Sequence, residues 1–307
     1  MYYQKQLPFF LILLLIAISS SAQNDLPTSN GILNGQYLKF DDDTQTTTSG
    51  KFKNNLRTGE WIIRDSSDQI VLTRQYHSIY SYTEKRTKPT DVDYELEETT
   101  NIKFTTERDS FGLYKLPKVD HTNIIWSKRV WTLLPEVEHG QLYSQEILIR
   151  VNQWINNGKI KVYKDDELSA VIDKQEVDLN NKKCIGVTMK KDYFFDKKSG
   201  MMMEQIVALT FHVESNKNEE KETFSIYYPT DGRKLLSSFN VSHKSDKIKH
   251  YDDLFFFQDY TEVIYNEANA KGIKIEPDFA NIKLYQQTSN AIKQLIVSTE
   301  HRLWVMD

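Results

Sequence analysis

Apolar side chains follow two rhythms along this chain. In its back half they recur every three or four residues, which is the spacing of one helix face. This spacing predicts helices over residues 145–157 and 292–303, and a third that begins at Asp252 and reaches Ile264. Continuous apolar runs predict strands, at residues 160–162, 206–213 and 224–228. Helices and strands mix without regular alternation, so the pattern predicts an α+β fold.

The predicted helix at residues 145–157 carries signals at both of its ends. Ser144 is a residue type that caps helix starts, and Gly158 is the type that most often follows a helix end. Trp154 falls on the same helix face as Ile147 and Val151. We therefore expect Trp154 to belong to the core.

The front part of the chain contains a short repeat with a strand rhythm. Gly35-Gln-Tyr37 is echoed by Gly59-Glu-Trp61. Each copy predicts a turn glycine, one polar residue and an aromatic residue that lands on one face of a sheet. The repeat resembles the MORN-type repeats of many bacterial exported proteins, and an ordinary β-meander is the alternative interpretation. The MORN resemblance implies a protein-interaction surface.

Composition narrows the classes of function. The chain has 307 residues, with 39 basic and 43 acidic side chains and a net charge of −4. A near-neutral chain gives no global electrostatic case for binding nucleic acid or anionic lipid. Its single cysteine, Cys184, excludes an intrachain disulfide and a zinc site made of cysteines. We expect a buried, inert thiol there, with a reactive thiol as the alternative.

The amino terminus has the layout of an export signal. Lys5 precedes an apolar run at residues 9–18, and small residues then lead to a cleavage position after Ala22. This layout predicts a secretory signal peptide over residues 1–22. A membrane anchor is the alternative, but a spanning helix needs about 20 apolar residues. We expect no membrane span after removal of the signal, and an exported protein.

Breaks in the pattern suggest how the chain is divided. Residues 84–118 are polar, interrupted by prolines, and contain alternating runs at residues 92–96 and 102–104 that predict one or two strands. The pattern predicts a β-repeat region over residues 24–83, this connecting segment, and a domain over residues 119–307. The last boundary is expected near Pro117.

The back domain resembles a known family. Its landmarks are Trp126–Trp131, Asn157–Tyr163 with Asp166 and Glu167, Asp192–Lys197, Ile226–Pro229, Tyr251–Phe256 and Glu300–Trp304. In order and spacing they resemble GldN, also called PorN, of the type IX secretion and gliding-motility machinery of Bacteroidota. Thr132 and residues 135–139 depart from the family pattern, and the front repeat is additional. These departures favour a divergent paralogue.

The resemblance implies a structural function. Family members are periplasmic, lack known catalysis, and assemble with a lipoprotein of the GldK/PorK type and with copies of themselves into a ring under the outer membrane. The expected partners are therefore envelope proteins. Trp and Arg dominate many interfaces, and the candidate partner-binding residues are Trp126, Lys128, Arg129, Trp131, Tyr37 and Trp61. Placement of the tryptophans in the core is the alternative.

The sequence lacks common catalytic and phosphate-binding motifs. It contains no Gly-rich phosphate loop, no Gly-x-Ser-x-Gly and no His-Glu-x-x-His. We read Asp41-Asp42-Asp43 as a charged turn, because a calcium loop would want Gly and Glu at the positions of Thr46 and Phe52. We expect no catalytic residue, metal or cofactor. The alternatives are a periplasmic ligand-binding or hydrolytic protein that reuses the fold, and an outer-surface adhesin built from β-repeats.

Overall fold

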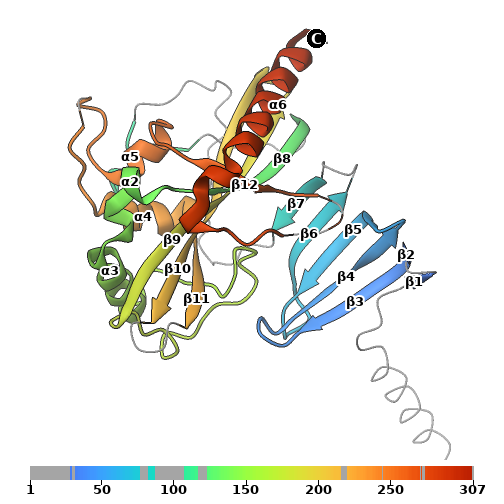
Figure 1. Cartoon of the computed structure of the whole chain (residues 1–307), viewed down its shortest axis with the longest axis horizontal. Coiled ribbons are helices and arrows are strands. Elements are labelled where there is room, and N and C mark those ends of the chain that lie inside the picture. Colours follow the sequence, from blue (N-terminus) through green and yellow to red (C-terminus); the bar gives the residue numbers. More distant parts are fainter. Residues whose placement is uncertain are drawn as a thin grey trace, which may run out of the picture. The chain divides into compact units, whose positions relative to one another are not determined.

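The computed structural model describes residues 28–29, 32–76, 82–86, 107–116, 123–215, 220–243, 245–269, 271 and 274–305 (Figure 1). The predicted signal peptide at residues 1–22 and the strands predicted at 92–96 and 102–104 lie outside these residues. The chain divides into two compact units. Unit 1 comprises residues 1–87 with 270–272, and unit 2 comprises residues 88–269 with 273–307. Antiparallel sheets and helices occur together, which confirms the predicted α+β class.

Unit 1 contains an antiparallel sheet in which each strand pairs with the next along the chain. Its strands are β3 (Gly35–Asp41), β4 (Thr46–Lys53), β5 (Leu56–Arg64), β6 (Ile70–Tyr76) and β7 (Tyr82–Arg86). A small hairpin of β1 (Thr28–Ser29) and β2 (Ile32–Leu33) precedes it. Asn54 and Asn55 form the turn between β4 and β5 with φ of 52° and 64°. Asparagine tolerates these left-handed angles better than most residues, and such turns match the twist of a hairpin.

Aromatic rings form a ladder across unit 1, as the repeat predicts. The ring of Trp61 lies 5.2 Å from Tyr37, 5.0 Å from Phe52 and 6.4 Å from Tyr76 between centroids. Tyr82 continues the ladder, 5.3 Å from Tyr76. Trp61 is only 3% exposed. Edge-on and tilted aromatic contacts of this kind stabilise a sheet beyond the area that they bury.

Gly50 leaves room for the Trp61 ring of the aromatic ladder, because it has no side chain. A Cβ at Gly50 would lie 2.2 Å from the Trp61 ring, a severe overlap with a side chain that has no room to move. We expect Gly50→Ala to destabilise unit 1 by about 1–3 kcal/mol, the usual cost of overpacking. Gly140→Ala is the control, because a Cβ at Gly140 meets nothing within 4 Å. Hydrogen exchange measured on peptides from β3 to β6 should accelerate in the first variant and stay unchanged in the second.

Unit 2 is built on a five-stranded antiparallel sheet with the order β11-β10-β9-β8-β12. The strands are β8 (Ile124–Leu133), β9 (Lys182–Asp196), β10 (Met201–Ser215), β11 (Lys221–Tyr227) and β12 (Val263–Glu267). The predicted strands at residues 206–213 and 224–228 correspond to β10 and β11. The strand predicted at residues 160–162 does not form. Instead the next residue, Tyr163, makes isolated bridges to Val171 and Ser225.

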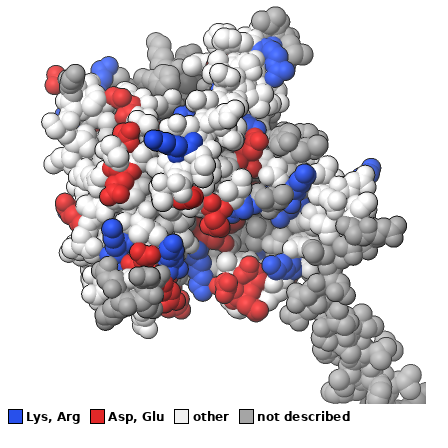
Figure 2. Space-filling view, viewed as in Figure 1, with Lys and Arg blue, Asp and Glu red and all other residues white. Residues whose placement is uncertain are grey.

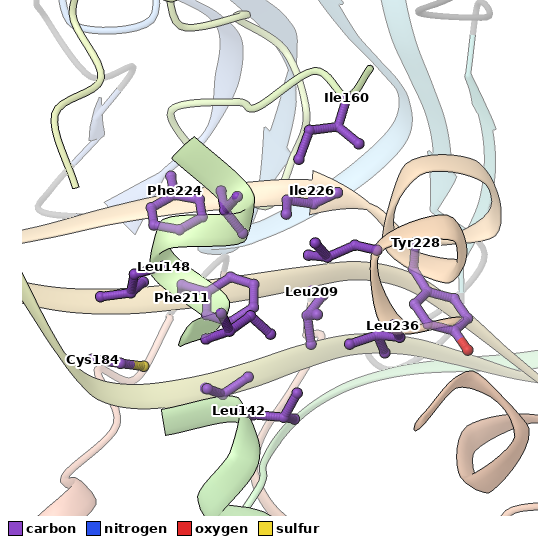
Figure 3. Packing of buried hydrophobic residues seen from close by; sticks show 14 of the residues in the cluster. Leu142, Leu148, Ile160, Cys184, Leu209, Phe211, Phe224, Ile226, Tyr228 and Leu236 are labelled. Atoms are coloured by element: carbon purple, nitrogen blue, oxygen red, sulfur yellow. The ribbon is translucent and has the colours of Figure 1, made fainter. Parts of the chain in front are cut away.

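Helices and the sheet enclose the main core of unit 2. Helix α3 (Gln145–Asn156) agrees with the predicted helix, and Gly158 follows it with φ of 65°. The Ser144 side chain does not cap the helix, because its Oγ donates to the Gln141 carbonyl instead. Figure 3 shows side chains from α3, β9, β10 and β11 converging in this core. Trp154 is partly buried and packs against it, in agreement with its expected place.

Shorter elements complete this side of unit 2. They are α2 (Glu136–His139), the 3₁₀ helix η2 (Gly140–Tyr143), the π-helical turn η3 (Tyr228–Gly232), α4 (Arg233–Ser237) and α5 (Tyr251–Phe256). The prediction of one helix from Asp252 to Ile264 was wrong. His250 precedes α5 as its N-cap, and Asp252 lies inside the helix. The helix ends at Phe256, Gln258 has a left-handed φ of 54°, and Ile264 belongs to β12.

The carboxyl-terminal helix agrees with the prediction in type and is longer. After the 3₁₀ turn η4 (Phe279–Tyr285), α6 extends over Gln286–Val305. Ile292 and Ile296 pack on Val130 and Ile264 of the sheet. Leu295, which we expected on the same buried face, is exposed. None of the described helices has the length and apolar character needed to cross a membrane.

Part of the predicted connecting segment belongs to unit 2. Residues 107–116 turn back on themselves with a bridge between Arg108 and Tyr114. The Tyr114 ring stacks on Phe256 with centroids 4.7 Å apart. The Arg108 guanidinium lies 3.0 Å from the Asp253 carboxylate. The predicted boundary near Pro117 therefore has part of unit 2 on its amino-terminal side.

Candidate functional site

The basic residues of Trp126–Trp131 are internal to unit 2. Lys128, Arg129 and Trp131 in β8 are all buried, and Trp126 is partly buried against the cluster under α6. The Arg129 guanidinium binds the Asp192 carboxylate through Nε at 2.6 Å and Nη2 at 2.5 Å. Arg129 and Asp192 are direct cross-strand neighbours in β8 and β9. Lys128 forms an ion pair with Glu267 at the end of β12.

Two adjacent lysines in the middle of β9 are fully buried. Successive strand residues point to opposite sheet faces, so Lys190 and Lys191 need separate partners. Lys190 Nζ lies 2.8 Å from Glu167 Oε2 and 3.1 Å from the Asp166 carbonyl. On that same side, the indole N–H of Trp131 donates to Asp166.

The Asp166 carboxylate also binds Lys274, whose Nζ lies 2.8 Å from Oδ1. Burial alone would raise the pKa of Asp166, but the charges of Lys190 and Lys274 outweigh burial and lower it. Asp166 is therefore an ionised anchor for one face of the sheet.

On the opposite face, Lys191 Nζ has three acceptors for its three N–H bonds. Glu204 Oε1 and Glu262 Oε1 each lie at 2.7 Å, and the Tyr260 hydroxyl lies at 2.9 Å. The Tyr260 hydroxyl donates in turn to Glu204 at 3.0 Å. Burial, followed by the charges of Glu262 and Glu204, raises the pKa of Tyr260 well above its ordinary value, so this hydroxyl remains a donor. The ammonium is thus fully satisfied.

A third internal network joins helices α4 and α5. The Arg233 guanidinium binds Asp252 through Nε at 3.1 Å and Nη2 at 2.9 Å, and Nη2 also donates to the Tyr114 carbonyl at 2.7 Å. The Tyr228 hydroxyl donates to Asp252 at 2.8 Å. Arg233 and Asp252 are both buried. The next residue, Asp253, accepts from Arg108, and these hydrogen bonds outweigh its burial and lower its pKa.

These three networks explain most of the sequence landmarks of unit 2. Four of the six landmarks supply a side chain to them, a fifth supplies Asp192 to the ion pair with Arg129, and the sixth supplies Glu300, which accepts from the Met202 backbone N–H at 3.1 Å. Reasoning from the sequence missed four central members: Lys190, Lys191, Arg233 and Glu262. The signal was present in β9, where two lysines interrupt an otherwise apolar run. Buried lysines require paired carboxylates.

The candidate partner-binding residues lie in both units. Tyr37 and Trp61 are members of the aromatic ladder of unit 1, and Trp126, Lys128, Arg129 and Trp131 lie together on β8 of unit 2. Partner contact stays a prediction for this set. In the folded chain Lys128, Arg129 and Trp131 are held in internal contacts, so Trp126 is the member of the β8 group with surface to offer.

Within the part of the chain that the structure describes, hydroxyl and imidazole groups meet in two places, both at least partly buried. Thr188 Oγ1 and His212 Nε2 are 3.1 Å apart, and His139 lies between the Tyr251 hydroxyl and the Thr261 carbonyl at 2.7 and 2.8 Å. Burial lowers the pKa of His139, which keeps its ring neutral. Among the described residues, no group of three or more His, Cys, Asp or Glu could hold a metal ion.

The environment of His212 predicts acid sensitivity. Burial, followed by the charge of Lys274, lowers the pKa of His212 to about 4, whereas an unfolded histidine titrates near about 6.5. The unfolded chain therefore binds this proton first, so stability falls as pH drops from about 6.5 to about 4, by about 3 kcal/mol from this group. We expect His212→Gln to flatten this part of a urea-unfolding pH profile, while His301→Gln, at an exposed position, leaves it unchanged.

Cys184 is a buried free thiol, as expected. Its Sγ donates to the Gly186 carbonyl at 3.5 Å. Burial raises the pKa of Cys184 to about 12. The nucleophilic thiolate is therefore scarce at neutral pH.

The exposed face of α6 differs from the rest of the surface. Figure 2 shows Lys and Arg interspersed with Asp and Glu over the face drawn, without one dominant sign of charge. Along α6, the exposed side chains are mainly uncharged, and they include Leu295, Val297 and Trp304. Exposed apolar side chains grouped on one element are typical of interaction surfaces.

No curated protein matches this chain. The family model described as gliding motility associated protein GldN matches residues 119–305. The match contains the whole sheet of unit 2, its three ion-pair networks apart from Arg108 and Tyr114, and α6 up to its last residue, Val305. Since the match covers more than half of the chain, this protein belongs to the GldN family of gliding motility associated proteins.

Proposed function

We propose that this protein is a non-enzymatic, exported assembly protein that acts as a ring subunit of the type IX secretion and gliding-motility machinery. The family match over residues 119–305 is the observation that carries the proposal. We place the protein in the periplasm, held at the outer membrane by a lipoprotein of the GldK/PorK type and by copies of itself. The predicted export signal agrees with that location.

The use of charge inside unit 2 supports an architectural role. Catalytic groups need an open approach for substrate and a proton that can move. Lys190, Lys191 and Arg233 are instead buried and saturated by carboxylates and hydroxyls of the same chain. Such networks fix one arrangement of the strands and helices, which a subunit that repeats around a ring requires.

Unit 1 supplies a separate surface in this proposal. We propose that its sheet is a MORN-type repeat that binds an envelope protein. The repeated Gly-x-aromatic pattern and the continuous aromatic ladder support this assignment. Unit 1 would then add a contact that the GldN-like unit alone does not have, in keeping with a divergent paralogue.

Co-purification from the native envelope tests the proposal. The full chain with a carboxyl-terminal affinity tag is expressed in its own cells, and the envelope is solubilised in mild detergent. We expect the lipoprotein and untagged copies of this chain to elute with it. A tagged exported protein of similar size, carrying the same signal, is the control for nonspecific capture. Recovery of the chain only as a free monomer would count decisively against the ring-subunit role.

A further inference from the structure

One end of the unit 2 sheet brings together three segments that are far apart in sequence. The turn between β9 and β10, residues 197–200, is tied to the chain just before β8, because the Lys197 N–H donates to the Asn123 carbonyl at 2.9 Å. The indole N–H of Trp304, near the end of α6, donates to the Gly200 carbonyl. Figure 1 shows the end of α6 beside this end of the sheet. We call this region the tip, formed by residues 123–126, 196–202 and 300–304.

Large apolar side chains are exposed at the tip. Ile125 is 50% exposed, Met201 37% and Trp304 56%. Each comes from a different segment, and their backbones are fixed by the contacts just described. Exposed Trp, Ile and Met side chains held by a rigid turn can enter the boundary between lipid headgroups and acyl chains without an ordering cost at the moment of binding.

Among the described residues of the tip, three basic side chains outnumber two carboxylates, although the whole chain is acidic. Lys197 and Lys198 lie exposed in the turn, and Arg302 lies exposed in the last turn of α6. The nearby carboxylates are engaged by backbone N–H groups: Asp196 accepts from Lys198 at 2.9 Å and Glu300 accepts from Met202 at 3.1 Å. The tip thus offers exposed cations beside exposed apolar side chains.

We propose that the tip binds the surface of a bilayer that carries anionic headgroups. Exposed apolar side chains beside exposed cations match the layers of such a surface, where acyl chains lie beneath phosphates. A protein partner would need complementary carboxylates at matching positions, whereas a lipid surface needs only a negative potential. This inference goes beyond the ring-subunit role, because it gives the chain a membrane contact that depends on no partner protein.

Vesicle flotation tests the proposal with the chain from residue 23 onward, since the apolar run at residues 9–18 would itself enter lipid. The probes are vesicles of phosphatidylcholine with phosphatidylglycerol and vesicles of phosphatidylcholine alone. We expect binding to the anionic vesicles that weakens with salt. Each lysine near such a surface contributes about fivefold in partitioning. Lys197→Glu with Lys198→Glu should therefore reduce binding at least about tenfold.

Matched variants separate the tip from general effects. The control variant, Lys183→Glu with Lys221→Glu, makes the same charge change at exposed positions. These positions lie at the starts of β9 and β11, at the end of the sheet away from the tip, so this variant should retain binding within about twofold. Trp304→Ser should weaken binding and Leu284→Ser, an exposed apolar control before α6, should not. Circular dichroism confirms that each variant is folded. Three results would each overturn the proposal. They are the absence of binding by the folded chain, an equal loss of binding in tip and control variants, and tip variants that keep vesicle binding but lose envelope proteins.

Discussion

Replacing Arg233 by Met should lower the free energy of unfolding of unit 2 by about 3–5 kcal/mol. Arg233 holds the buried Asp252 carboxylate at 2.9 Å, and its Nη2 also satisfies the Tyr114 carbonyl. Methionine fills much of the same volume but leaves Asp252 charged, or forces it to take up a proton, in a fully buried site. The penalty therefore comes from the orphaned carboxylate, more than from the lost attraction.

Urea unfolding followed by circular dichroism measures this effect. Lys115→Met is the control, because its pair with Glu107 is solvent-exposed at 3.5 Å and should be worth about 0–1 kcal/mol. The double variant Arg233→Met with Asp252→Leu removes both charges and should recover a large part of the loss. A loss below about 1 kcal/mol in Arg233→Met would show that the pair does not hold α4 to α5.

The elements that the sequence predicts well are those set by local spacing. Helix α3 and helix α6 follow from apolar residues at helical intervals, and β10 follows from a continuous apolar run. The helix expected after Asp252 fails for a nonlocal reason. A carboxylate near a helix start is normally a cap, but Asp252 is drawn into the interior by Arg233, which lies 19 positions away in sequence.

Strand β9 likewise depends on contacts with residues that are distant in sequence. Lys190 and Lys191 interrupt its apolar pattern, so the periodicity did not predict a strand there. Their burial depends on carboxylates supplied by distant segments, such as Glu167 and Glu262. The position of such a partner is a property of the fold and not of local sequence.

The burial of two candidate partner-binding residues has a related cause, and their contact with partners stays a prediction. Tryptophan and arginine are typical of interfaces, which made Arg129 and Trp131 natural candidates. Both side chains are buried because Asp192, 63 positions beyond Arg129, and Asp166 complete their hydrogen bonds. Five of the six landmarks contribute side chains to internal ion pairs or charge networks. The tip is assembled from three segments that are distant in sequence, so no single segment carries a sequence pattern that predicts this surface.

Replacing Lys191 by Met should destabilise unit 2 by about 3–5 kcal/mol. The ammonium lies 2.7 Å from both Glu204 and Glu262, so its removal leaves two partly buried carboxylates facing each other. Lys183→Met is the matched control on the same strand, since Lys183 is exposed and should change stability by less than about 0.5 kcal/mol. Urea unfolding of the variants compares the two positions directly.

The pH dependence identifies the cause of this loss. Two like charges that share a site favour uptake of a proton by one of them, so the folded Lys191→Met variant binds more protons than its unfolded chain as pH falls. Its deficit against the native protein should therefore shrink between about pH 7 and about pH 5. Glu204→Gln with Glu262→Gln added to Lys191→Met should remove the pH dependence and restore much of the stability, because neutral amides can still bond the Tyr260 hydroxyl. A deficit that is constant with pH and unrelieved by these substitutions would mean that the packing of the lysine stem, and not its charge, stabilises this face of the sheet.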